Sequence, residues 1–528
     1  MNFFKKHWLT CFSAVCAAAL IIFCIIYFST THHSVDKKSL ITNGPFVNVG
    51  GPPYNAKCDG VTDDRIAIQT AIDSVEADQK KILQLPAGRC MLMTPTGGHG
   101  VIPLHGQTLR GFDRDSTTLV MSPGSADGTF LIYATAPDIT IENLTLDGSK
   151  SGQTPGEHRH GIMGNHAPRL KIQHVTSQNF MGDGFYVYTG SDHVTVTDVL
   201  GQLNSRNGLT LGGQFDTGDF SDSTFIDNGA QQFDTEPGVG STAKNIRIWN
   251  STFDGHAVSS QYVLTVGGSS GVDLAKNWDI HGNRINGAIY VCWASDIRIY
   301  NNTGTNTTTH STMLYRTTDH IRIWGNTWTT TAAPAGIEIN GTGPGQMTTN
   351  ALITNNELLI ATPGASAGLA ISGAISVEFS DNIVRGAGLA VINSAGLKIR
   401  ATSPVVNFKT MIVRRNHISN FGRAGIFVTG NDLARLQMLD ITDNVFDDDS
   451  SVSTMTSAMS LNDDEGNAAA HVKVSGNVVM GGVSTLYSRR PPSGAKSVLT
   501  GDEWITTEIV TIPFPTVSTT SPITSPVN

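Results

Sequence analysis

Short runs of alternating apolar and polar residues recur along the chain, and most of them end in Asn or Asp. In each run every second side chain is apolar, which is typical of a β-strand with one buried and one exposed face. The pattern therefore predicts an all-β chain built from many short strands. The runs span 139–143, 170–174, 194–198, 246–250, 297–301, 321–326, 352–356, 377–382, 441–444 and 472–477.

The runs return at a nearly constant interval. His174 and Asp198 are 24 positions apart, and so are Asn302 and Asn326, within the ~20–50 residues that mark repeat proteins. Asn tolerates the left-handed backbone of tight bends, and stacked Asn side chains can form a ladder. We therefore expect a parallel β-helix (a solenoid), with a β-sandwich as the alternative architecture.

One amphipathic helix is expected ahead of most of these strands. The apolar residues from Ile68 to Val75 follow the i, i+3, i+4, i+7 spacing of a single helix face. Thr62 or Asp63 can cap its N-terminus with a side-chain oxygen. A short β-like run at 81–85 follows and is stopped by Pro-Ala-Gly.

The N-terminus carries a long apolar stretch. Residues 8–29 contain no charge, and at ~1.5 Å per residue they would form a helix of roughly 33 Å, enough to cross a ~30 Å hydrocarbon core. Lys5 and Lys6 precede the stretch, so the positive-inside rule keeps the N-terminus cytoplasmic. We predict a single-pass membrane signal-anchor with the bulk of the chain periplasmic or extracellular. A cleaved signal peptide is the alternative, which would change the anchoring but not the compartment.

The composition excludes several classes of protein. With 39% hydrophobic and 15% charged residues among 528, the chain is too apolar for a disordered tail and can bury a large core. Its 55 glycines lack a Gly-X-Y period, which excludes collagen and favours turn-rich β structure. A net charge of −9 without any basic run argues against nucleic acid as a partner.

The six cysteines fall into two groups, three within residues 8–29 and three beyond them. Cys58 and Cys90 can form a disulfide in an oxidising compartment, with free thiols as the alternative. The bridge would close a loop of about 30 residues, worth ~3–4 kcal/mol in chain-entropy models. Cys292 has no cationic neighbour in sequence to depress its pKa, so we expect a packed thiol. The sequence contains no CxxC or HExxH spacing, and it therefore indicates no zinc site.

The region around the expected helix carries a specific set of strings. They read Asn-Ala-Lys-Cys-Asp-Gly-Val-Thr-Asp-Asp at 55–64, Ala-Ile-Gln-Thr-Ala-Ile-Asp at 67–73 and Leu-Pro-Ala-Gly at 85–88. Together they resemble the opening of the pectate-lyase-like β-helix proteins of the rhamnogalacturonase and epimerase type, with Cys58 where that family usually has Gly. The resemblance covers 46–93 and implies a right-handed parallel β-helix whose N-terminal end is plugged by the helix. It does not fix a reaction, because the superfamily includes lyases, hydrolases, epimerases and phage tail-spikes.

A second strand follows the Asn bend in the middle repeats, at about 161–163, 183–188, 207–211, 232–236 and 288–291. Neighbouring turns lie ~4.8 Å apart, so stacking would gather two carboxylates and several Tyr rings on one outer face. Such a face suits a sugar, because aromatic rings pack against sugar rings and carboxylates accept hydroxyl hydrogen bonds. The expected inward side chains are Phe185, Val187, Leu209, Leu211, Phe233 and Ile289. The expected outward side chains are Tyr186, Tyr188, Thr210, Asp234, Glu236 and Tyr290.

Asp234 and Glu236 are the candidate catalytic pair. They lie two residues apart on one strand, and their repulsion would raise one pKa and leave an acid beside a base. The backbone spacing of ~6.5–7 Å is at the lower edge of the ~6.5–9.5 Å typical of inverting glycosidases. Two solvated surface carboxylates, or a cation site, are the alternatives. Ca²⁺ is a cofactor that the resemblance to pectate lyases leaves open, although we find no dedicated acidic cage in the sequence.

Two further strings, Gly-Asp-Gly at 182–184 and Asn-Gly-Leu-Thr-Leu-Gly at 207–212, resemble the places where polygalacturonases carry Gly-Asp-Asp and Gly-His-Gly. Asp183 matches the first Asp of the doublet, but Gly184 replaces the second and Asn207 replaces the His. This departure puts plain polygalacturonase chemistry in doubt. Asp183 is therefore either a catalytic carboxyl or a turn residue.

A lyase or epimerase would need different groups. A base must remove the proton next to a uronate carboxyl and a cation must stabilise the resulting enolate, so His160, Tyr186 and Arg206 are candidates. An exposed loop around His160 is the alternative. The candidate substrate-binding residues are Tyr186, Tyr188, Asn207, Tyr290 and Glu338.

These expectations combine into one organisation of the chain. It comprises a cytoplasmic tip (1–7), a transmembrane signal-anchor helix (8–29), a linker (30–44), a cap with the first strand (45–95), the parallel β-helix (96–500) and a Pro/Ser/Thr-rich tail (501–528). The predicted function is hydrolysis, elimination or epimerisation of an extracytoplasmic polysaccharide that contains uronate. A non-catalytic glycan-binding or cell-envelope scaffold protein is the alternative from another class.

Overall fold

The structure is a computed structural model, and the predicted transmembrane helix at 8–29 and the tail at 501–528 lie outside the residues that it describes. Among the described residues, no helix is long and apolar enough to cross a membrane. The described residues are 46–75, 81–94, 98–255, 262–268, 274–341, 346–361, 366–387, 394–400, 408–428, 436–449, 455–461, 471–483 and 487–488.

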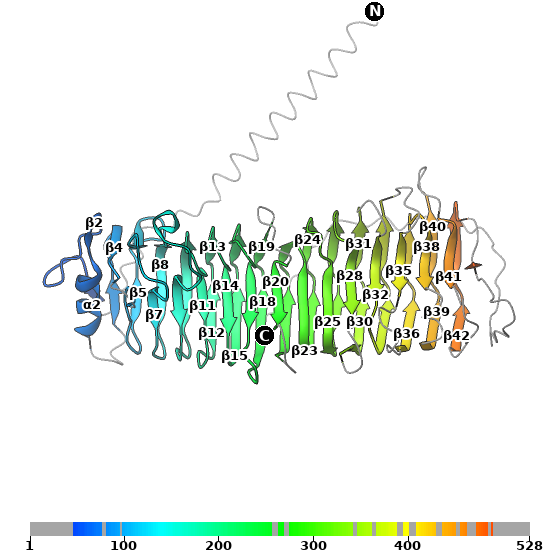
Figure 1. Cartoon of the computed structure of the whole chain (residues 1–528), viewed down its shortest axis with the longest axis horizontal. Helices are drawn as coiled ribbons and strands as arrows, with labels where there is room; N and C mark the ends of the chain where they lie inside the picture. The colour runs from blue at the N-terminus through cyan, green and yellow to red at the C-terminus, as the bar shows by residue number, and fades with distance from the viewer. Residues whose placement is uncertain are drawn as a thin grey trace, which may run out of the picture. The chain divides into compact units, whose positions relative to one another are not determined.

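From Phe46 onward the described strands pair in parallel and wind into a solenoid with three sheets, here named A, B and C (Figure 1). A typical turn of the chain passes through sheet C, then B, then A, before it returns to C one layer further along. Because the strand pairings of the described residues are parallel throughout, the β-sandwich alternative is wrong. The fold implied by the resemblance, a right-handed parallel β-helix, is confirmed.

The strands of each sheet stack in chain order, and the long strands β8, β10, β23 and β25 bend from one sheet into the next. Sheet A contains β7 (Phe130–Ala134), β9 (His160–Gly164), β11 (Phe185–Val187), β14 (Leu209–Gly212), β17 (Phe233–Glu236), β20 (Leu264–Gly267), β23 (Ile289–Tyr300), β25 (Thr312–Asp319), β28 (Ala335–Asn340), β32 (Ala367–Ile371), β35 (Ala395–Ile399), β38 (Ala424–Val428), β41 (Ser457–Leu461) and β44 (Tyr487–Ser488).

Sheet B contains β2 (Asp59–Asp63), β4 (Gly88–Leu92), β6 (Thr117–Met121), β8 (Thr140–Asp147), β10 (Lys171–Gln178), β13 (Leu200–Gln202), β16 (Thr224–Ile226), β19 (Thr252–Asp254), β22 (Arg284–Asn286), β24 (Thr303–Asn306), β27 (Thr327–Thr330), β31 (Glu357–Ile360), β34 (Ile383–Gly386), β37 (His417–Ser419), β40 (Val445–Asp448) and β43 (Val478–Gly481).

Sheet C contains β1 (Phe46–Asn48), β3 (Ile82–Gln84), β5 (Thr108–Arg110), β12 (Val194–Thr197), β15 (Phe215–Ser221), β18 (Ala243–Trp249), β21 (Ala275–His281), β26 (Arg322–Trp324), β29 (Thr348–Thr349), β30 (Ala351–Thr354), β33 (Ser376–Ser380), β36 (Phe408–Arg414), β39 (Leu436–Thr442) and β42 (His471–Ser475), with parts of β8, β10, β23 and β25.

The predicted helix, α2 (Arg65–Asp73), lies at the N-terminal end of the solenoid (Figure 1). Its apolar face is buried and joins the core, which confirms the predicted plug. The helix begins after Asp64, which makes no side-chain capping bond. The predicted cap by Asp63 is confirmed, because its Oδ1 accepts the backbone N–H of Arg65, the first helical residue (3.1 Å). The Asp64 carboxylate instead accepts the backbone N–H groups of Lys57 (2.6 Å) and Cys58 (2.9 Å).

Cys58 and Cys90 form a disulfide in the structure, which decides between the two alternatives for these thiols. The bridge joins the segment before β2 to β4 and is buried beside α2 in the core. Cys292 is buried with a free thiol, as expected for a packed residue.

The core runs along the inside of the three sheets and is made by the inward side chains of each strand. All six side chains predicted to point inward on sheet A are at most 1% exposed. The alternation of apolar and polar residues therefore predicted the direction of these side chains correctly.

The repeated Asn forms a ladder at the corner between sheets C and B. At each step the side-chain oxygen of one Asn accepts both the backbone N–H and the side-chain amide of the Asn one turn earlier, as in Asn326 to Asn356 (3.1 and 2.9 Å). The left-handed backbone belongs to the residue just before, for example Asn355 with φ 54°. Two successive residues thus divide the roles that the sequence assigned to one Asn. The rungs are Asn283, Asn302, Asn326, Asn356, Asn382, Asn416, Asn444 and Asn477.

Candidate functional site

The predicted outward residues lie side by side on the outer face of sheet A. In the register of β11, β14 and β17, Tyr186 is beside Thr210 and Thr210 is beside Asp234. Glu236 lies two residues further along β17, beside Gly212. The structure therefore brings the candidate catalytic pair and Tyr186 together, as stacking in register predicted.

An open groove of about 820 Å³ begins at this pair and continues over the following turns of sheet A. Tyrosine side chains from three successive turns line it, alongside backbone and small polar groups. Of these residues the sequence pattern predicted Tyr290, but not Tyr262, Tyr315 or Arg316. The alternation in β25 places Tyr315 on the same face as Met313, and this signal could have found it. The groove is lined by Gln231, Asp234, Thr235, Glu236, Pro237, Tyr262, Thr265, Gly268, Tyr290, Met313, Tyr315, Arg316 and Asn340.

Asp234 lines the groove although it is only 8% exposed, so it is not a solvated surface carboxylate. Its Oδ1 accepts the N–H of Thr235 (2.8 Å), and its Oδ2 lies 3.4 Å from the side-chain amide of Asn207. Burial, reinforced by the negative charge of Glu236, raises the pKa of Asp234 to about 7. At neutral pH this carboxyl can therefore carry a proton.

Glu236 is more open, with 36% of its side chain exposed, and its carboxylate is held from two sides. Arg206 forms an ion pair and hydrogen bond with its Oε1, and the hydroxyl of Tyr186 donates to its Oε2 (3.3 Å). These contacts fix the carboxylate at the mouth of the groove, two residues from the protonatable Asp234.

Asp183 is fully buried beneath this pair and does not line the groove. Its Oδ1 accepts the N–H of Asn207 (2.9 Å), and its Oδ2 lies 3.4 Å from Nη1 of Arg206. Burial raises the pKa of Asp183 to about 7, and the charge of Arg206 opposes that shift. In the structure Asp183 is thus neither a plain turn residue nor a group that touches the groove, and its contacts position Arg206.

His160 is buried at the start of β9, so the exposed-loop alternative is wrong for this residue. Its ring lies 5.5 Å from that of Phe130 and 5.0 Å from that of Tyr186, stacked on both. Its Nδ1 accepts the backbone N–H of Asp183 (2.9 Å). Burial, helped by the charge of Arg206, lowers the pKa of His160 to about 3, so the imidazole is neutral. Its basic nitrogen is therefore occupied by a structural hydrogen bond.

The remaining predicted binding residues lie at different depths. Tyr188 is 37% exposed and stacks on Tyr186, with ring centres 5.9 Å apart. Asn207 is buried and donates to Thr210 Oγ1 (3.0 Å), which places it behind the groove. Glu338 on β28 lies beside Met313 on β25, but it does not line the groove. Its carboxylate accepts a hydrogen bond from the side-chain amide of Asn340 (3.3 Å).

The acidic residues of the site do not fit a bound Ca²⁺. The guanidinium of Arg206 already lies between Asp183 and Glu236, and it occupies the position that a cation would take. Over the described part of the chain, one group of His, Cys, Asp and Glu is close enough to share a metal, namely Cys58, Asp64 and Cys90. The disulfide uses both of those sulfur atoms.

Comparison with known proteins finds likenesses among solved structures. No family model matches the chain, and no curated protein does. The A-module of the mannuronan C-5 epimerase AlgE4 of Azotobacter vinelandii is 16% identical, with a TM-score of 0.35, over 86% of this chain and 100% of that one. The tailspike protein of E. coli bacteriophage HK620, in complex with a pentasaccharide, is 12% identical, with a TM-score of 0.47, over 84% and 80%.

A third likeness is the catalytic unit of a GH87 α-1,3-glucanase from Streptomyces thermodiastaticus. It is 13% identical, with a TM-score of 0.38, over 83% of this chain and 69% of that one. The parallel strand pairing of the chain itself defines the fold.

Proposed function

We propose that the chain is a glycoside hydrolase that cleaves a polysaccharide bound along the groove of sheet A. The observation that carries the proposal is a buried carboxyl with a raised pKa, Asp234, which shares an open, tyrosine-lined groove with the ion-paired Glu236. Glycoside hydrolysis needs one protonated and one ionised carboxyl on either side of the scissile bond. The different surroundings of Asp234 and Glu236 suit this division of roles.

In this mechanism Asp234 is the general acid and Glu236 is the general base. Asp234 donates its proton to the glycosidic oxygen as the bond to the anomeric carbon breaks. Glu236 accepts a proton from the water that attacks the opposite face of the sugar ring. Arg206 and the Tyr186 hydroxyl keep the Glu236 carboxylate in position, and Asp183 positions Arg206 from below.

The backbone spacing of the two residues is compatible with inversion of the anomeric centre. Side chains two residues apart on one face of a strand are separated by ~6.5–7 Å at the backbone. Inverting enzymes hold their carboxyls ~6.5–9.5 Å apart to admit a water, whereas retaining enzymes hold them at ~5–5.5 Å.

Elimination and epimerisation receive less support from this geometry. Both need a base for the proton next to a uronate carboxyl, and the basic nitrogen of His160 is already hydrogen bonded in a buried position. Both also need a cation for the substrate carboxylate, and Arg206 is engaged by Asp183 and Glu236. The tyrosines of the groove are also expected in a protein that only binds a glycan. Binding alone, however, does not require a buried carboxyl with a raised pKa.

The reaction class can be tested by mass spectrometry. The full chain is incubated in ¹⁸O-labelled heavy water (D₂¹⁸O) with a panel of neutral and acidic polysaccharides, and the products are weighed after their hydroxyl deuterons have been exchanged back for hydrogen. Hydrolysis adds one ¹⁸O atom at each new reducing end, and this is the expected result. Unsaturated products would mean elimination, uncut chains that have exchanged a carbon-bound hydrogen would mean epimerisation, and unchanged glycans would favour the binding role. Each of these three results overturns the proposal.

We further propose an extracytoplasmic location for the solenoid, with the apolar stretch at 8–29 as its single-pass membrane anchor. The Cys58–Cys90 disulfide supports this proposal, because such bridges persist in oxidising compartments. Treatment of intact cells, or of spheroplasts where the cells have an outer membrane, with a membrane-impermeant protease should degrade the chain, whereas a cytoplasmic control protein survives. Full protection of the chain would contradict the proposed location.

A further inference from the structure

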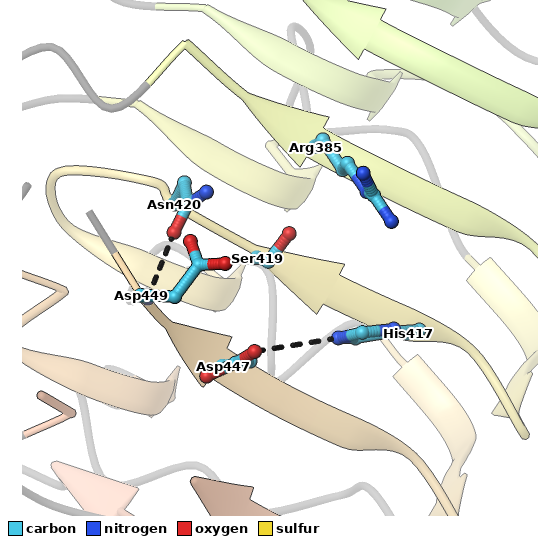
Figure 2. A pocket seen from close by; sticks show the side chains of 6 residues that line it. All are labelled: Arg385, His417, Ser419, Asn420, Asp447 and Asp449. Atoms are coloured by element: carbon cyan, nitrogen blue, oxygen red, sulfur yellow. Dashed lines mark hydrogen bonds and ion pairs between the residues drawn. The ribbon is translucent and has the colours of Figure 1, made fainter. Parts of the chain in front are cut away.

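A second pocket lies on sheet B, near the C-terminal end of the solenoid and away from the groove of sheet A. Its volume is about 270 Å³, which is room for one small ring rather than for a chain of sugars. The side chains around it come from the neighbouring strands β34, β37 and β40 and from the ends of the last two (Figure 2). They are Arg385, His417, Ser419, Asn420, Asp447 and Asp449.

The inner wall of the pocket contains an imidazole and a carboxylate that face one another without a hydrogen bond. Nε2 of His417 lies 3.8 Å from Oδ2 of Asp447, which is too far for a hydrogen bond. This nitrogen is buried and has no hydrogen-bond partner among the described residues. A hydroxyl oxygen ~2.8 Å from each atom would satisfy both. Because the nitrogen is closed to solvent in the structure, a ligand hydroxyl reaches it only when the His417 ring turns toward the pocket.

The protonation states of this pair suit such a hydroxyl. Burial lowers the pKa of His417, so the imidazole is neutral at neutral pH, and it can donate or accept through Nε2 according to its tautomer. Burial also raises the pKa of Asp447, whose side chain is 9% exposed. A buried polar pair of this kind gains from a ligand that can be donor and acceptor at once.

The rest of the lining offers both donors and acceptors around the same hollow. Arg385 supplies guanidinium N–H groups, and Asp449 supplies carboxylate oxygens. Asn420 is oriented by its Oδ1, which accepts the N–H of Asp449 (3.2 Å), so that its amide N–H groups remain as donors. Adjacent hydroxyls on a ring need this mixture, since each of them donates one hydrogen bond and accepts others.

From this geometry we infer that the pocket is a second saccharide-binding site, which takes a single neutral, hydroxyl-rich sugar unit. The two carboxylates outnumber the one guanidinium, which disfavours an anionic ligand such as a uronate or a phosphate. The guanidinium of Arg385 in turn disfavours a metal ion. No metal-sized group of His, Cys, Asp and Glu includes His417 or Asp447 among the described residues.

The test is saturation-transfer difference NMR on the full chain with the neutral methyl glycosides of glucose, galactose and mannose. At least one of them should receive saturation from the wild-type protein. Asp447→Asn and Arg385→Ala should each reduce that signal at least about fivefold. Arg322→Ala, an exposed arginine on sheet C, is the matched control and should leave the signal unchanged.

Two further variants separate this site from the groove. Asp234→Asn and Glu236→Gln should leave the sheet B signal intact, so that the site is measured whether or not the chain proves to be a hydrolase. Near- and far-ultraviolet circular dichroism of each variant confirms that it is folded. Absence of transfer to every glycoside would overturn the inference, and so would equal signals in wild type and Asp447→Asn. Binding of Mn²⁺ or Ca²⁺ that is lost in Asp447→Asn, without glycoside binding, would make it a cation site instead.

Discussion

The neighbouring turns of sheet A shield the Asp234 carboxyl from water, and this burial keeps it protonated up to a pH of about 7. An acid with a folded-state pKa of about 7 is present below that pH and is lost as the pH rises through it. We therefore predict that kcat falls above pH about 7, and that Asp234→Asn lowers kcat by roughly 10²–10⁴-fold and removes this limb. A pH–rate profile from pH 5 to 9 measures both effects, and a wild-type profile that is flat across pH 7 would contradict the role.

Arg206 acts through other residues, so its loss should change how the site titrates as well as how fast it works. Its positive charge opposes the rise in the pKa of Asp234, and removal of that charge in Arg206→Ala should move the alkaline limb to higher pH. Displacement of Glu236 should lower kcat by about 10–100-fold with little change in KM. Arg206→Lys, which keeps the charge, should restore the position of the limb. An alkaline limb that is unmoved in Arg206→Ala would reduce Arg206 to a structural residue.

At the scale of single residues, the sequence predicted which face of the sheet a side chain points to better than it predicted the burial and contacts of that side chain. The alternation along β17 correctly placed Asp234 and Glu236 on the outer face. The burial of Asp234 and the role of His160 depend on contacts with turns more than 20 positions away. Such contacts leave no periodic signal, and for this reason the sequence analysis left a surface loop open for His160.

The Asn ladder is the element that makes one corner of the solenoid regular, and each rung depends on the next. Asn356 accepts two hydrogen bonds from Asn326 and donates to the carbonyls of Ile323 and Thr354 and to Asn382. Asn356→Ala leaves buried donors and acceptors unpaired, at ~1–3 kcal/mol each. We predict a loss of at least about 2 kcal/mol in the free energy of unfolding, measured by chemical denaturation.

The matched control for this prediction is the preceding residue. Asn355 is exposed and has a left-handed backbone, which Gly adopts without strain. Asn355→Gly should therefore change stability by less than about 0.5 kcal/mol. Equal losses in the two variants would mean that the corner depends on backbone shape and not on the ladder of side chains.

At the scale of elements, the strands and the helix could be predicted because both follow a fixed period. The apolar spacing from Ile68 onward located α2, and the alternating runs located strands of sheet C. Strands of sheet B were harder, since several of them, such as β37, have only three residues, too few for a period to show. For this reason the sequence did not predict the pocket of sheet B.

The whole solenoid is held together by contacts between neighbouring turns, so damage at one end should stay local. The disulfide closes a segment of 32 positions at the N-terminal end, a constraint worth ~3–4 kcal/mol in chain-entropy models. We predict that Cys58→Ser with Cys90→Ser increases hydrogen exchange in α2 and β4, while the exchange of β14 and β17 is unchanged. Mass spectrometry of exchanged peptides measures this, and a uniform increase along the chain would show a single cooperative unit.

The architecture was predictable at this largest scale for two reasons that support each other. The interval between repeats limits the choice to a solenoid, and the strings at 55–64 and 85–88 resemble those at the start of known β-helices. The reaction was not predictable in the same way, because a β-helix carries many chemistries and the groove is assembled from successive turns. The hydrolase assignment therefore depends on Asp234 and Glu236 and not on the fold.

The most direct test of that assignment is the release of reducing ends from the cleaved polysaccharide by four proteins. They are the wild type, Asp234→Asn, Glu236→Gln and the control Asp219→Asn, which changes an aspartate of sheet C that pairs with Arg247. We predict a loss of at least about 10²-fold in the first two variants and activity within about twofold of wild type in the control. Retention of wild-type activity in either Asp234→Asn or Glu236→Gln would contradict the account.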